Sequence, residues 1–250
     1  MSSIKIYNCD CMEMLKNTPD SSIDLIITDP PYEICCTGGG GNQGHKISTM
    51  GADLVDLNIN TGYDIRKVGK EIVRVMKKMN VYFWCNKKQI PDYFDYYVKE
   101  LGCKFDILTW NKINPVPTYS NKYLTDTEYC LYFRNGGMCN PKNYEDAKTY
   151  WNDPINAKDK QMWEHPTIKP QHMIEKLIRN SSTQGQFVMD LYLGSGTTAA
   201  ACKKLNRNFI GSEINEKYYN IALKRVEETV QETEDEQSPL TEFFEWNTNL

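Results

Sequence analysis

Short apolar segments alternate with longer segments of helical period along most of this 250-residue chain. The apolar segments have the length of strands, and the segments between them repeat apolar residues every three or four positions. Because parallel strands need a helix-length crossover, the alternation predicts a doubly wound, mainly parallel α/β sheet with helices on both faces. The seven expected strands are Ile4–Tyr7, Asp24–Thr28, Asn80–Cys85, Cys103–Trp110, Thr127–Phe133, Gln186–Asp190 and Asn208–Ser212. The expected helices are Asp64–Met79, Pro91–Leu101, Gln171–Ser181, Thr197–Leu205 and Asn215–Val230.

Two segments interrupt this alternation. Residues 33–60 are rich in glycine and are expected to form a mobile loop, whereas residues 134–164 are polar and show no clean period. A chain of this length with 40% hydrophobic residues can bury one sizeable α/β core. We therefore expect one domain over residues 1–230, followed by an acidic tail over residues 231–250.

The charge of the chain is unevenly distributed. Eight acidic residues and no Lys or Arg follow Arg225, so the rest of the chain carries +4 although the whole carries −4. A mildly basic body permits contacts with phosphate groups, although ordinary solvated surfaces reach the same value. No window approaches the ~18–20 continuous apolar residues of a membrane span, and the first residues lack the apolar stretch of a signal peptide. A cytoplasmic protein without membrane contact is expected.

The cysteine and histidine patterns argue against a metal site. None of the nine cysteines forms a C-x-x-C pair, and the three histidines show no ligand spacing. We expect reduced and mostly buried thiols, and no metal.

The hexapeptide ITDPPY at 27–32 directly follows an apolar run. Two successive prolines fix the backbone and offer no N–H, so the segment from Asp29 presents acceptors and no donors. An acid, a fixed carbonyl and the flat ring of Tyr32 together suit a planar group that carries an amino function. The alternative is a strand that ends in a proline turn, with Tyr32 in ordinary packing, and the hexapeptide alone does not decide between them.

A second constellation reads QFVMDLYLGSGTT at 186–198. Here an apolar strand ends at Asp190, and Gly194-Ser195-Gly196 opens a helix whose N-terminus offers free N–H groups to an anionic ligand. The next strand ends at Glu213, about the ~20-residue distance at which an acid binds a ribose hydroxyl in nucleotide folds. The pattern predicts an adenosine-binding half-site, with a tight turn that binds no ligand as the alternative.

Three of these segments carry a family resemblance. TDPPY at 28–32, HPTIKP at 165–170 and DLYLGSGTT at 190–198 resemble the signature segments of amino-group DNA methyltransferases that use S-adenosylmethionine. Their order is similar to that of the β group of these enzymes. The segments YNCDCMEMLKNTPDSSIDLIITDPPY, LTWNKINPVP and TDTEYCLYF are also similar to family segments, so the resemblance covers most of residues 4–225. It implies a Rossmann-like methyltransferase sheet.

The resemblance also implies roles for single residues. The catalytic segment would be Asp29, Pro30, Pro31 and Tyr32, which would hold the target base. Asp10 and Cys11 would lie at the edge of the cofactor's adenine, and Glu213 would lie at its ribose. Thr167 and Lys169 would reach its methionine carboxylate. The cofactor pocket implied as a whole comprises Asp10, Cys11, Asp29, Thr167, Lys169, Asp190, Tyr192, Gly194, Ser195, Gly196, Thr197 and Glu213. This chain departs from the family pattern at Cys9, Leu191-Tyr192 and Ile168, and none of these departures removes a reacting group.

These roles describe a definite chemistry. If Asp29 and the Pro30 carbonyl each accept an N–H of an exocyclic amine, the nitrogen can aim its lone pair at the methyl group of the cofactor. A base in double-stranded DNA must leave the duplex to be reached, and Tyr32 would stack on it. By the resemblance, Asp at position 29 favours adenine N6, with cytosine N4 and RNA adenine as alternatives. A catalytically idle DNA-binding or cofactor-sensing module is the alternative from another class.

Two further expectations concern the partners. Residues 134–164 stand where the resemblance places target recognition, although a plain solvated insertion would have the same composition. Related enzymes are often dimeric, which makes a homodimer an expectation of the resemblance.

Overall fold

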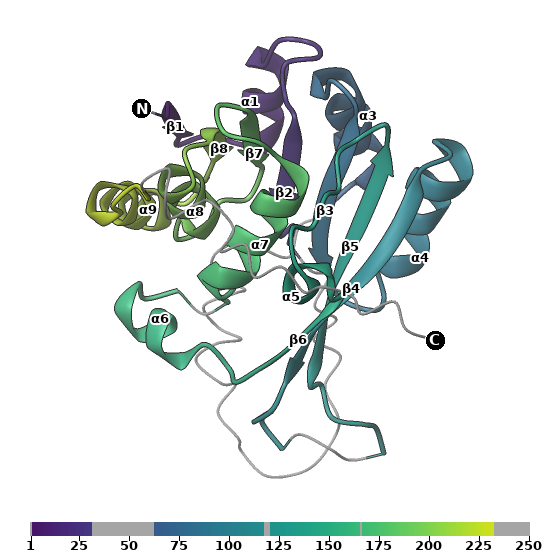
Figure 1. Cartoon of the computed structure of the whole chain (residues 1–250), viewed down its shortest axis with the longest axis vertical. Coiled ribbons are helices and arrows are strands. Elements are labelled where there is room, and N and C mark those ends of the chain that lie inside the picture. The colour runs from purple at the N-terminus through teal and green to yellow at the C-terminus, as the bar shows by residue number, and fades with distance from the viewer. Residues whose placement is uncertain (1, 32–62, 118–120, 166, 233–250) are drawn as a thin grey trace, which may run out of the picture.

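One eight-stranded sheet organises the protein in the computed structural model, which describes residues 2–31, 63–117, 121–165 and 167–232 (Figure 1). The strand order is β1-β8-β7-β2-β3-β5-β4-β6. Tyr32, the whole glycine-rich segment 33–60 and all but the first two residues of the expected tail lie outside the described residues. The strands are β1 Ile4–Tyr7, β2 Leu25–Thr28, β3 Met79–Cys85, β4 Lys104–Lys112, β5 Thr127–Asn135, β6 Tyr150–Asp153, β7 Phe187–Asp190 and β8 Asn208–Ser212.

Most neighbouring strands run parallel, and only β5 runs antiparallel to its two neighbours. The doubly wound, mainly parallel fold is therefore confirmed, but the expected number of seven strands was wrong. The eighth strand, β6, lies inside the polar segment 134–164 and pairs with β4 in the register Trp110 to Trp151. It was missed because a four-residue strand at a sheet edge, with only Trp151 buried, leaves no period to detect.

Helices connect the strands with few departures from expectation. The helix predicted to continue to residue 79 ends at Val75, because the backbone of Met76 is extended and the chain turns into β3. The helix predicted at 91–101 is a short α-helical turn followed by a π-helical segment. The helical elements are α1 Cys11–Asn17, α3 Ile65–Val75, α4 Ile90–Tyr93, η1 Phe94–Glu100, α5 Tyr144–Ala147, α6 Ala157–Met162, α7 Gln171–Ser181, α8 Thr197–Lys204 and α9 Glu216–Glu228. In the part of the chain described, no helix has the length and apolar character needed to cross a membrane.

Each face of the sheet has its own core, because successive strand residues point to opposite sides. Ile26 of β2 packs with α1, α3 and η1, whereas Leu25 and Ile27 pack with α7 and α8. The same alternation separates Phe83 from Trp84 in β3. Figure 1 shows α3 and α4 on one side of β3 and β5, with α7 and α8 on the other. The described cysteines are free, and most are buried, as the sequence predicted.

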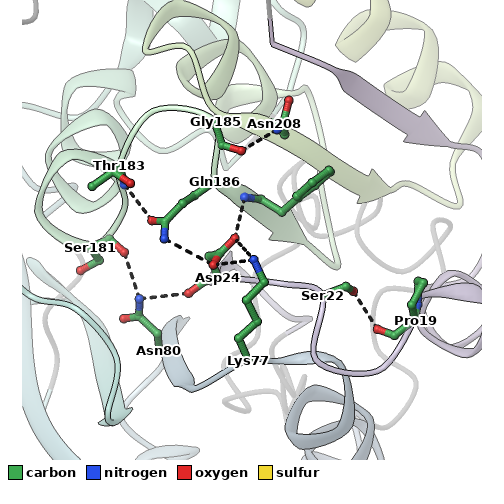
Figure 2. A network of polar contacts seen from close by, with 11 residues as sticks. Pro19, Ser22, Asp24, Lys77, Asn80, Ser181, Thr183, Gly185, Gln186 and Asn208 are labelled. Carbon is green, nitrogen blue, oxygen red and sulfur yellow. Dashed lines mark hydrogen bonds and ion pairs between the residues drawn. The ribbon is translucent and has the colours of Figure 1, made fainter.

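A polar network fixes the beginning of β2 (Figure 2). The carboxylate of Asp24 accepts hydrogen bonds from Lys77 Nζ and from the backbone N–H of Phe187, both at 2.9 Å. The amide of Asn80 donates to the carbonyls of Asp24 and Ser181. These contacts join the starts of β2, β3 and β7, so the relative position of the three strands is set at their amino ends.

This network predicts a stability effect. Asp24→Ala is expected to lower the free energy of unfolding by about 1–3 kcal/mol, because it leaves the Phe187 N–H and the Lys77 ammonium without their shared acceptor. Urea unfolding followed by circular dichroism measures this loss. Ser22→Ala, which removes only an exposed bond to the Pro19 carbonyl, is the matched control and should change stability far less. Equal stability of the two variants would contradict the structural role of Asp24.

Candidate active site

The two sequence constellations meet because β2 and β7 are hydrogen-bonded neighbours. Both strands are parallel, so the segment after Thr28 and the segment after Asp190 leave the sheet at the same edge. The backbone N–H of Leu191 donates to Thr28 Oγ1 at 3.3 Å, which ties the two segments directly. Asp29 and the glycine segment therefore belong to one site, although more than 160 residues separate them.

The glycine segment makes a tight turn into α8. Gly194 and Gly196 have φ of +55° and +85°, in the left-handed region that favours glycine. A Cβ on Gly196 would also lie 2.8 Å from Ala222 Cα, so glycine lets α9 approach the turn. Helix α8 begins at Thr197 without a side-chain cap. Its first-turn N–H groups therefore remain available to a ligand.

Asp190 stabilises the turn through hydrogen bonds. Its carboxylate accepts from Thr198 Oγ1 at 2.7 Å and from the backbone N–H of Tyr192 at 3.1 Å. Burial raises the pKa of Asp190 to about 6, although the hydrogen bonds from Thr198 and Tyr192 oppose the shift. This aspartate thus fixes the geometry of the glycine turn.

Glu213 holds the same turn from β8. Its two carboxylate oxygens accept the N–H groups of Gly194 and Asn215, both at 2.8 Å. Burial raises the pKa of Glu213, and these backbone bonds oppose the shift. Each oxygen keeps a second lone pair, so the carboxylate can still accept a bond from a ligand hydroxyl.

The segment after β1 lies beside this corner. Asn8 Nδ2 donates to the Glu213 carbonyl at 2.8 Å, and Asp10 caps α1 by accepting the Met12 N–H at 2.8 Å. The thiol of Cys11 donates to Tyr192 Oη at 3.2 Å. Asp10 and Cys11 are thus placed behind the glycine turn, in contact with it through Tyr192.

The HPTIKP segment faces the glycine turn from the other side. His165 Nε2 would lie 3.0 Å from a Cβ on Gly194, and the His165 ring packs edge-on against Tyr218 at 4.4 Å between centroids. Its Nδ1 accepts the Thr167 N–H at 3.3 Å, so a neutral ring carries its proton on Nε2. Burial and the nearby charges of Lys169, Arg225 and Lys160 lower the pKa of His165 to about 4. His165 is therefore neutral at physiological pH.

Lys169 lies between two carboxylates in the wall of the site. Its ammonium pairs with Asp29 and lies 3.2 Å from Glu128 Oε2. Glu128 in turn accepts from Lys112 Nζ at 2.5 Å. Sequence reasoning assigned no role to Glu128, because it stands in a strand whose apolar period gives no sign of an ion pair. The available sequence signal for this residue was a charge that stands next to the start of the apolar run in TEYCLYF.

These residues line a small cleft that opens to solvent. Among the predicted residues, those in its wall are Asp29, Thr167, Lys169, Asp190, Tyr192, Gly194, Ser195 and Thr197. Gly196, Glu213, Asp10 and Cys11 are not among the residues of this wall, although Glu213 and Cys11 form hydrogen bonds with Gly194 and Tyr192, which are. Pro30 and Pro31 follow Asp29. Trp84, which was not predicted, also lines the cleft, and its buried Nε1 meets no acceptor among the described residues.

Comparisons with known proteins identify a family for this chain. A family model described as DNA methylase matches residues 23–224. The type II methyltransferase M2.LlaDCHI of Lactococcus lactis subsp. cremoris is 29% identical over 238 residues, covering 88% of either chain. The type II methyltransferase M.HinfI of Haemophilus influenzae is 30% identical over 246 residues, covering 89% of this chain and 68% of the relative.

Two solved structures have a similar fold. The crystal structure of the M1.HpyAVI-SAM complex superposes with a TM-score of 0.64 at 27% identity, covering 89% of this chain and 99% of that chain. The PvuII DNA methyltransferase, described as cytosine-N4-specific, superposes with a TM-score of 0.66 at 17% identity, covering 90% and 86%.

The neutral His165 predicts a pH effect on stability. In the unfolded chain this imidazole binds a proton near pH 6.5, but in the folded chain only near pH 4, so stability falls as pH falls through this window. His165→Gln should remove the effect and reduce the loss of unfolding free energy between pH 6.5 and pH 4 by about 1–3 kcal/mol. Urea unfolding at several pH values measures it. The control is His172→Gln at an exposed histidine beside Asp153, and an identical pH profile for wild type and His165→Gln would refute the prediction.

Proposed function

This chain belongs to the DNA methylase family, and we propose that it transfers a methyl group to the N6 amino group of adenine in double-stranded DNA. It is a DNA methyltransferase that uses S-adenosylmethionine. The observation that carries the proposal is the shared cleft, in which the Asp29 carboxylate and the glycine turn line the same wall. A base-binding acceptor and a cofactor turn in one cleft are what methyl transfer to an amine requires.

The residues of the cleft fit the cofactor. The uncapped N-terminus of α8 and the Thr197 hydroxyl suit a carboxylate, and Glu213 offers acceptors for ribose hydroxyls. The buried Trp84 Nε1 is a donor that a bound acceptor would satisfy. When bound, S-adenosylmethionine supplies an electrophilic methyl group on a positively charged sulfur. We therefore propose that the glycine turn, Glu213 and Thr167 hold it.

Asp29 then acts on the target base. The lone pair of an exocyclic amine is delocalised into the ring, and an anionic acceptor on one N–H draws the nitrogen toward tetrahedral geometry. The Pro30 carbonyl, fixed by the following proline, is proposed to accept the second N–H. Alkylation places positive charge on this nitrogen, which the Asp29 carboxylate stabilises until the nitrogen loses a proton to water.

Adenine is preferred over cytosine through the residue type at position 29. Asp rather than Ser stands before Pro-Pro-Tyr, and by family resemblance this favours adenine N6. The fold itself does not separate the two, because the cytosine-N4-specific PvuII enzyme superposes over most of the chain. Both amines present the same donors, so the base must be identified in the product. Digestion of methylated DNA to nucleosides and mass spectrometry distinguishes N6-methyladenine from N4-methylcytosine, and methylcytosine alone would overturn the adenine proposal.

The cofactor proposal predicts the effect of Glu213→Ala. This variant should weaken S-adenosylmethionine binding by about 1–3 kcal/mol, because it removes a charged acceptor from the ribose and the brace of the Gly194 N–H. Isothermal titration calorimetry measures the affinity. Glu216→Ala, at an exposed glutamate in the first turn of α9, is the control and should bind as wild type does. Wild-type affinity in Glu213→Ala would count against the proposed ribose site.

The catalytic proposal predicts the effect of changing Asp29. Asp29→Ala should keep the fold and most of the cofactor affinity while methyl transfer falls by at least about a hundredfold. Asp29→Asn keeps the shape but replaces part of an anionic acceptor with a donor, so it should also be severely impaired. Transfer of a radiolabelled methyl group to DNA measures the rate, and Asp95→Asn, at an exposed ion pair with Lys99, is the control. Near-normal transfer by Asp29→Ala would show that another group activates the amine.

A further inference from the structure

Four side chains of alternating charge form a row across the carboxyl edge of the sheet. The row begins at Lys112 of β4, whose Nζ lies 2.5 Å from Glu128 Oε1 of β5. The other oxygen of Glu128, Oε2, lies 3.2 Å from Lys169 Nζ, and Lys169 pairs with Asp29 after β2. The row therefore links the base-binding carboxylate to two strands that contribute no residue to the glycine turn.

The antiparallel strand β5 makes this row possible. Because β5 runs opposite to β3 and β4, its beginning rather than its end lies at the edge where the site is built. In the register of β4 and β5, Glu128 stands opposite Trp110, and Trp110 precedes Lys112 by two residues. A parallel strand at this position would have brought its last residues here instead.

Lys169 is the most buried member of the row, with 7% of its side chain exposed. Its ammonium also lies 5.2 Å from the centroid of the Trp84 ring. A buried cation of this kind is stable only when its charge is compensated. Asp29 and Glu128 share this compensation, so neither carboxylate alone has to neutralise Lys169.

Glu128 is ionised throughout the working range of the enzyme. Burial opposes its ionisation, but Lys169 and Lys112 outweigh the burial and lower the pKa of Glu128 to about 2. A fifth charge lies near the row, because Lys160 of α6 interacts with Lys112, Glu128 and Lys169. Without Glu128 the row itself would hold the ammonium groups of Lys112 and Lys169 and the carboxylate of Asp29, with the ammonium of Lys160 nearby.

This excess of positive charge would oppose the reaction that the proposed function requires. Methyl transfer moves positive charge from the sulfur to the amine nitrogen, next to Asp29. A carboxylate that is fully paired with Lys169 is a weaker acceptor for the amine, and an uncompensated ammonium beside it repels the developing charge. The negative charge of Glu128 therefore stabilises mainly the transition state of methyl transfer.

We propose that Glu128 is a positioning residue for methyl transfer, which acts through Lys169 by sharing its charge and leaving Asp29 a strong acceptor for the target amine. The proposal rests on the proposed function of Asp29. It also gives Lys169 a place beside the base rather than at the methionine carboxylate of the cofactor. A purely structural ion pair would contribute to stability and leave the rate at saturation unchanged.

A double-mutant cycle separates these roles. Glu128→Gln keeps the size of the side chain, and methyl transfer at saturating DNA and S-adenosylmethionine should fall by about tenfold or more. Cofactor affinity, measured by calorimetry with S-adenosylmethionine and with S-adenosylhomocysteine, should stay within about twofold of wild type. In a Lys169→Met background, Glu128→Gln should change the rate by no more than about twofold, because its partner is absent.

The controls distinguish a local loss of folding from a loss of positioning. Asp106→Asn breaks an ion pair with Arg134 at the opposite end of the same two strands, and it should keep the wild-type rate. Glu128→Asp retains the charge and should recover part of the rate lost in Glu128→Gln. Melting temperatures of all variants show whether the fold is kept.

Three results would overturn the proposal. The first is an unchanged rate in Glu128→Gln, and the second is an equal fall in the presence and absence of Lys169. The third is a loss of cofactor affinity in Lys169→Met as large as its loss of rate, which would place Lys169 on the cofactor. Failure of the proposed function is separate, because wild-type protein would then form no N6-methyladenine while the calorimetric comparison could still be made.

Discussion

The parallel pairing of β2 with β7 is the constraint on which the site depends. It places the end of β2, with Asp29, beside the end of β7, with the glycine turn, and the Leu191 N–H to Thr28 Oγ1 bond fixes their separation. The network around Asp24 holds the same strands at their amino ends. Both ends of the pair are thus fixed, so the proposed acceptor for the base and the proposed turn for the cofactor keep a constant separation.

The glycine turn is rigid because three side chains form hydrogen bonds with its backbone. Asp190 accepts the Tyr192 N–H, Glu213 accepts the Gly194 N–H, and Ser212 Oγ donates to the Leu191 carbonyl at 2.9 Å. The close approach of α9 at Gly196 leaves no room for a side chain. Because the protein's own groups make these contacts, little of the free energy of ligand binding has to be used to order the turn.

Electrostatics divide the cleft into two parts. Around the glycine turn, Lys169, Arg225 and Lys160 surround a His165 that stays neutral, which suits the binding of an anionic group. Near Asp29, charges alternate along Lys112, Glu128 and Lys169, so the Asp29 carboxylate shares the Lys169 ammonium with Glu128. Lys169 stands between the two parts, because its charge acts on His165 as well as on these two carboxylates.

The sequence by itself determined the features that short stretches of consecutive residues encode. The alternation of strands and helices predicted the doubly wound sheet, and the DPPY and glycine segments predicted the family, both of which are confirmed. The roles of the single site residues remain predictions. The signals that succeeded were a strand end, a proline pair and a glycine turn, and each of them is encoded by consecutive residues.

Only the tertiary structure decided the contacts between distant segments. Glu128 reaches Lys169 because β5 reverses direction, and β6 joins the sheet because β4 offers it an edge, and local periodicity predicts neither contact. The neutral state of His165 likewise depends on burial and on cations from three separate segments. Local periodicity encodes which elements form, whereas strand order and side-chain charge compensation depend on which elements become neighbours in space.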